Sequence, residues 1–87
     1  MYQYEQEKPE LFTDEGQRMF IAIRDHVKHT LRQAGAIRMQ EAMSAAKGGN
    51  TWTMLACVDR MVELGELREL TRGDAPGQHR VFVSAVE

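Results

Sequence analysis

The side chains of this chain that can do chemistry are mainly cations and hydrogen-bond donors rather than nucleophiles. Arg60 can bond a phosphate or a base edge, Arg72 and Arg80 can contact the phosphate backbone, and Asn50 can bond a phosphate or a base without charge. The sequence contains no nucleophile elbow, no phosphate-binding glycine loop and no cluster of metal ligands, and its carboxylates are scattered. We therefore expect a binding protein that is not an enzyme and needs no cofactor.

Two further features could take part in chemistry, but their surroundings in the sequence indicate structural roles. His26 and His29 lie three residues apart, a spacing that can share a metal ion, but no third ligand follows nearby, so we expect no metal site. Cys57 is the single cysteine, which rules out a disulfide within the chain. It lies in a helical pattern of apolar and polar residues, where a small neutral side chain is its usual role.

Composition indicates a small globular domain. The chain has 87 residues, of which 43% are hydrophobic and 28% charged. The 11 lysines and arginines and 13 acidic residues give a net charge of −2. Proteins dedicated to nucleic acid are usually basic, so this balance weighs against such a partner. Because no apolar run reaches the ~18 residues of a membrane span and no signal peptide is visible, we expect a cytoplasmic location without membrane contact.

The expected elements begin with an acidic segment and a long helix. Residues 1–12 contain Pro9 and predict an extended N-terminal arm, and residues 13–87 predict one folded domain. Thr13 is a good N-cap, and apolar residues then recur at helical spacing as far as residue 34. Gly35 follows the last of them, where a left-handed helix cap needs no Cβ.

The rest of the domain predicts two more helices and a β-hairpin. Residues 36–38 form an extended link that can pair with a later strand, and residues 39–47 are strong helix formers. After a break at residues 48–50, Thr51 can cap a third helix with Leu55, Val58 and Val62 inward, which ends at Gly65. Residues 66–71 and 80–86 are prone to form strands and are separated by a turn rich in glycine and proline. The fold class expected is α+β, mainly α with a small antiparallel hairpin.

This order of elements resembles the winged helix-turn-helix superfamily. The stretch Val58-Asp59-Arg60-Met61-Val62-Glu63-Leu64-Gly65-Glu66-Leu67 is similar to the end of a recognition helix, its glycine cap and the first strand of the wing. A helix-turn-helix pattern set on residues 41–60 puts small Ala45 at the helix crossing and Gly49 in the turn. The resemblance implies three helices followed by a wing of two or three strands, with the third helix entering a DNA groove.

The resemblance also implies a set of DNA contacts. Projection of the third helix places Thr53, Ala56, Cys57 and Arg60 outward, with Trp52 on the shoulder of that face. The turn and the wing add basic residues that can contact the phosphate backbone. The full expected set is Lys47, Asn50, Thr51, Trp52, Thr53, Arg60, Arg72, His79 and Arg80.

Two partners remain open on the sequence alone. Duplex DNA is the leading partner, which would make the protein a small transcriptional regulator. The alternative is a non-catalytic protein-interaction module on the same scaffold, or a homodimer, and it is favoured by the negative net charge and by Trp52 near the outward face. On exposed helices an arginine such as Arg60 is more often solvated or paired with a nearby acid such as Asp59 or Glu63 than used for binding.

Overall fold

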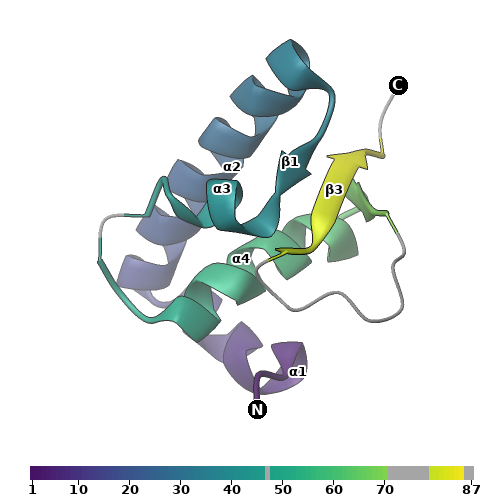
Figure 1. Ribbon diagram of the computed structural model, residues 1–87. Helices are drawn as coiled ribbons and strands as arrows, with labels where there is room; N and C mark the ends of the chain where they lie inside the picture. Colours follow the sequence, from purple (N-terminus) through teal and green to yellow (C-terminus); the bar gives the residue numbers. More distant parts are fainter. Residues whose placement is uncertain (47, 71–78, 86–87) are drawn as a thin grey trace.

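The long helix expected after Thr13 is present. In the computed structural model, which describes residues 1–46, 48–70 and 79–85, helix α2 spans Asp14–Ala34 (Figure 1). The Thr13 side chain accepts a hydrogen bond from the Gly16 amide at 3.0 Å, and Gly35 ends the helix with a φ of 80°. Ile23 and Val27 are completely buried on its inner face, as the apolar spacing predicts.

The N-terminal segment is helical, so the expectation that residues 1–12 are extended is wrong. Tyr4–Glu7 forms helix α1 and Lys8–Phe12 forms a 3₁₀ helix, η1. Pro9 lies in the first turn of η1, where a missing N–H does not break the helix. Leu11 is only 2% exposed and attaches the segment to the core, because the absence of a side chain at Gly16 lets the backbone of η1 lie directly against α2.

The second expected helix is shorter than the sequence suggests. Helix α3 covers Met39–Met43 rather than residues 39–47, and Ala45 lies in a turn after it instead of at a helix crossing. The reason is local, since both the amide and the hydroxyl of Ser44 donate hydrogen bonds to the Glu41 carbonyl, at 3.2 and 2.6 Å. These bonds tighten the last turn and compete with continued α-helix.

Helix α4 spans Thr51–Glu63, but its cap and its buried face differ from those predicted. Asn50, not Thr51, is the N-cap, and its side chain accepts a hydrogen bond from the Trp52 amide at 2.7 Å. Val58 is buried as expected, whereas the predicted inward residues Leu55 and Val62 are only partly buried. The side chains that are fully or almost fully buried are Thr53, Ala56, Cys57, Val58 and Met61.

The buried face of α4 differs from the predicted one because of how the helix packs. Ala56 and Cys57 are small, so they allow α4 to lie close to neighbouring elements, and α4 contacts both α2 and the N-terminal segment. The sequence projection placed both residues outward because it gave priority to the larger Leu55 and Val62. Their burial at 0% exposure makes that placement wrong.

The expected β-hairpin pairing is present and gains a third strand. β2 (Leu67–Glu69) and β3 (Val81–Ser84) are antiparallel, and β1 (Ile37–Arg38) pairs with the other edge of β3, as the extended link predicted. Phe82 pairs with Ile37 on one side and with Glu69 on the other, and its side chain is fully buried. The expected turn at residues 72–79 lies almost wholly outside the described residues.

The helices pack on one another and on the sheet to form a single core. Figure 1 shows the sheet beside α2 and α4, with α1 and the N-terminus at the end of the molecule away from the end of β3. Each of α2, α3, α4, η1 and the strands contributes a buried apolar side chain to this core. No helix in the described ranges is long and apolar enough to cross a membrane.

The close approach at Gly16 predicts a packing-sensitive variant. A Cβ at this position would overlap the carbonyl oxygen of Glu10, so Gly16→Ala must push η1 away from α2. We expect a loss of about 1–3 kcal/mol in the free energy of unfolding, measured by urea denaturation. A variant with the wild-type denaturation midpoint would show that η1 does not pack in this way.

Candidate functional site

The start of α4 carries the uncharged part of the expected contact set. Gly48 and Gly49 both have positive φ, 81° and 96°, a conformation in which glycine is favoured, and this turn sets where α4 begins. Asn50 and Thr51 are exposed, and Trp52 is 41% exposed. The structure therefore leaves these three consecutive residues exposed together at one end of the helix.

Thr53 and Cys57 do not belong to the outward face. Thr53 is only 8% exposed, and Cys57 is fully buried. Burial raises the pKa of the Cys57 thiol to about 12, so this side chain remains protonated and unreactive at neutral pH. The residue serves as a small packing group, in agreement with the structural role expected from its place in the helix.

Arg60 is engaged within the domain. Its guanidinium donates a hydrogen bond to the Glu63 carboxylate at 2.6 Å and lies 5.5 Å from the centre of the Phe12 ring. Glu63 also accepts hydrogen bonds from the Tyr4 hydroxyl at 2.7 Å and from the Lys8 ammonium at 2.9 Å. The N-terminal segment thus covers the side of α4 that carries Arg60, and Arg60 is the only basic residue of this helix.

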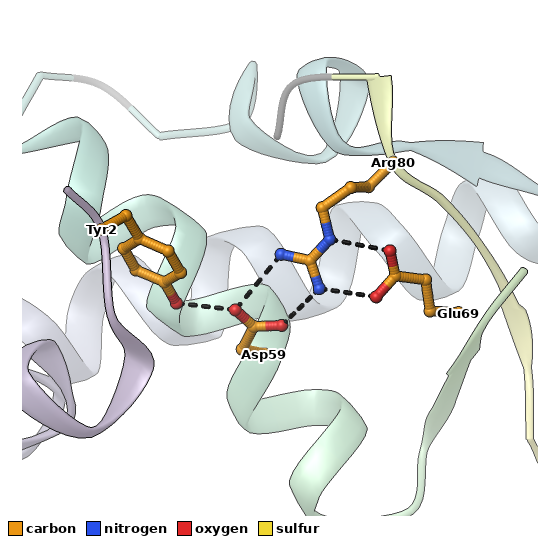
Figure 2. Close-up of polar contacts among 4 residues, drawn as sticks. All are labelled: Tyr2, Asp59, Glu69 and Arg80. Atoms are coloured by element: carbon orange, nitrogen blue, oxygen red, sulfur yellow. Dashed lines mark hydrogen bonds and ion pairs between the residues drawn. The ribbon is translucent and has the colours of Figure 1, made fainter. Parts of the chain in front are cut away.

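Arg80 is even more completely engaged. Figure 2 shows its guanidinium between two carboxylates, those of Asp59 on α4 and Glu69 on β2. The shortest bond to each carboxylate is 2.7 Å, and only 19% of the Arg80 side chain is exposed. On its other side Asp59 accepts a 2.6 Å hydrogen bond from the Tyr2 hydroxyl. The two carboxylates raise the pKa of Arg80, so it stays charged and fully paired.

The remaining expected contacts are His79, Lys47 and Arg72. His79 is exposed beside this network, whereas Lys47 and Arg72 lie outside the described residues. Within residues 1–46, 48–70 and 79–85, no three histidine, cysteine or acidic side chains come together as a set of metal ligands. Of the nine expected contacts, Asn50, Thr51 and Trp52 form an exposed group, Thr53 is largely buried, and Arg60 and Arg80 are paired within the domain.

Sequence reasoning missed Tyr2, Tyr4 and Lys8 as partners of α4. A signal existed, because Tyr4, Lys8 and Leu11 follow one another at spacings of four and three, which is typical of one helix face. The pairing of Arg80 with Asp59 has no such signal, because the two residues are 21 apart and meet only after the sheet has formed.

Comparison of the chain with protein-family models, with curated proteins and with solved structures found no match. The functional conclusion therefore rests on the geometry of the chain itself.

The Arg80 network predicts a clear difference between two arginine variants. Arg80→Met leaves Asp59 and Glu69 partly buried without their cation, and we expect it to lower the free energy of unfolding by about 2 kcal/mol. The matched control is Arg68→Met in β2, an exposed position, which should change stability by less than about 0.5 kcal/mol. Equal effects of the two variants in urea denaturation would contradict the network.

Glu63 predicts an acid-dependent loss of stability. Hydrogen bonds from Tyr4, Lys8 and Arg60 hold the pKa of Glu63 at about 2, below its ordinary value of 4.5. Because the folded-state pKa is the lower one, these bonds stabilise the fold above pH 4.5 and are lost as the pH falls toward 2. The melting temperature should therefore fall more steeply over this range in the wild type than in Glu63→Gln. Glu41→Gln, at an exposed carboxylate, is the control and should keep the wild-type slope. Parallel curves for the wild type and Glu63→Gln would refute the role of Glu63.

Proposed function

We propose that this chain is a non-catalytic protein-interaction module on a winged helix-turn-helix scaffold, and that it binds its partner through the exposed edge of α4. The observation that carries the proposal is the internal pairing of Arg60 and Arg80. DNA binding depends on cations that can replace the counterions of the phosphates. Both guanidinium groups instead hydrogen-bond carboxylates of the same domain, at 2.6 and 2.7 Å.

The exposed edge of α4 has the composition of a protein contact surface. Trp52 is 41% exposed in the first turn of the helix, and the partly buried Leu55 lies one turn further along. Tryptophan is enriched among the residues that contribute most to protein interfaces, since it buries a large area and loses little side-chain entropy. A partner that covers this edge would bury apolar surface without having to displace an ion pair.

The charge around this edge indicates the kind of partner. Asp59 and Glu63 lie on α4 itself, and Glu7 and Glu10 lie on the segment packed beside it. Asp59 and Glu63 are paired with cations of the domain, so the field at this edge comes mainly from Glu7 and Glu10. Together with the net charge of −2 for the whole chain, these two carboxylates repel phosphate and attract basic protein surfaces. We therefore propose a partner protein with a basic contact surface.

Duplex DNA is the second candidate, and the element order favours it. A helix pair with a glycine turn is followed directly by an antiparallel ribbon, which is the order of elements in winged-helix DNA-binding proteins. Asn50 and Thr51 are exposed at the start of α4, where they can reach phosphates or bases. In this alternative the protein would be a small transcriptional regulator.

A Trp52 variant tests the leading proposal. Affinity purification of the tagged chain from the cells that express it should capture a partner, whose direct affinity is then measured with purified components. Trp52→Ala should weaken that affinity by roughly 30-fold or more, the effect of losing a central interface aromatic. Ile21→Ala, which removes an exposed apolar side chain from α2, should change it less than about twofold.

Two results would count against the proposal. One is a partner affinity that is unchanged by Trp52→Ala. The other is binding to mixed-sequence duplex DNA, measured by fluorescence anisotropy, with an association constant whose logarithm falls linearly with the logarithm of the salt concentration. That result would favour the DNA candidate.

A further inference from the structure

A cavity of about 330 Å³ lies where the N-terminal segment, the start of α2 and the start of α4 meet. We refer to it as the acidic cavity. Its volume is at the lower end of the range for small-ligand sites and is sufficient for one long side chain. The residues that define its chemistry are Glu7, Glu10, Glu15, Met19, Asn50 and Thr53.

The lining of the acidic cavity is negative. Three carboxylates border it and no lysine or arginine does. The N-termini of α2 and α4 point toward the same region and offset part of this charge, each by about half an elementary charge. An excess of negative charge remains, and it selects a cation rather than an anion.

Thr53 provides an independent indication of a ligand. The residue is only 8% exposed, yet among the described residues its hydroxyl makes no hydrogen bond. No side-chain oxygen or nitrogen in the described part of the chain is both buried and without a partner. The Thr53 hydroxyl is therefore open to the cavity that the residue lines, where it can bond a bound group.

The carboxylates suit an extended cation. They do not form a set of ligands around one point, because no three acidic, histidine or cysteine side chains of the described residues are arranged to hold a metal ion. A guanidinium or ammonium group on a flexible stem can instead bond several separated acceptors. The Met19 side chain gives the aliphatic stem an apolar wall.

The surroundings favour a cation that belongs to a polypeptide. A larger hollow of about 620 Å³ adjoins the acidic cavity and shares Glu15 and Met19 with it, and its other walls are three alanines and Gly48 together with the charged Asp14 and Arg18. A chain that places a basic residue in the acidic cavity can therefore continue over a surface of small apolar side chains bordered by charges. Trp52, in the first turn of α4, lies between Asn50 and Thr53 in the sequence and can contact the same partner.

We propose that the acidic cavity binds an arginine or lysine side chain of the partner protein. This inference rests on the proposed function, because it assigns a chemical class to the contact that the partner makes beside Trp52. The cation replaces solvent at Glu7, Glu10 and Glu15 and donates a hydrogen bond to the Thr53 hydroxyl. Nucleic acid is excluded from this cavity by its charge.

The probe for this proposal is N-acetyl-arginine amide, titrated into the ¹⁵N-labelled protein and followed by the backbone amide signals of Gly49, Asn50 and Thr53. N-acetyl-citrulline amide has nearly the same shape without the charge and is the matched control ligand. We expect saturable shifts with the arginine derivative, at a dissociation constant in the range of about 1–20 mM, and none that saturate with the citrulline derivative.

Two variants locate the binding. Glu10→Gln with Glu15→Gln should weaken it about fivefold or more, and Thr53→Val, which breaks no internal hydrogen bond, should weaken it about threefold. Asp25→Asn removes one charge from an exposed position on α2 that is not part of the lining and should leave the affinity within about twofold. Equal binding of both derivatives, absence of saturation, or equal affinities in all variants would overturn the proposal.

These experiments distinguish failure of the cavity assignment from failure of the proposed function. If the arginine derivative binds in the acidic cavity but Trp52→Ala leaves the partner affinity unchanged, the cavity assignment stands and the proposed function fails. If Trp52→Ala weakens the partner affinity but the arginine derivative does not bind, only the cavity assignment fails.

Discussion

The guanidinium of Arg80 lies between the carboxylates of Asp59 and Glu69, and this interaction joins the sheet to α4. It stabilises the position of β3 against the helix, because Arg80 directly precedes that strand. Tyr2 bonds the same Asp59 and thereby connects the N-terminal segment to the network. Three parts of the chain that are distant in sequence are therefore held together by one set of charge-assisted hydrogen bonds.

This interaction also determines what the surface offers to a partner. A cation that is fully paired inside the domain does not contribute to phosphate binding, and an acid that is paired does not contribute to the surface field. What remains exposed near the start of α4 is Trp52, the amide of Asn50 and the acidic cavity. An aromatic side chain beside a negatively lined hollow is suited to a basic protein surface, the class of partner proposed for this chain.

The sequence predicted the elements better than the site. The sequence predicts α2 because its N-cap, the spacing of its apolar residues and its terminal glycine all indicate the same helix. It predicts the β-hairpin because turn residues flank both strands. The buried face of α4 was misplaced because small Ala56 and Cys57 carry little hydrophobic signal, although close packing requires them. The internal role of Arg80 depends on partners 11 and 21 residues away, and such contacts are set by the tertiary fold, not by local spacing.

The pairing of Arg60 and Arg80 can be observed directly by NMR of their Nε–H groups in the ¹⁵N-labelled protein. At low ionic strength, with mixed-sequence duplex DNA added in steps, both signals should keep their chemical shifts, because the guanidinium groups remain bound to Glu63, Asp59 and Glu69. Saturable shifts of either signal on addition of DNA would show that these arginines leave their internal partners for phosphate, and would contradict the proposed protein-binding function.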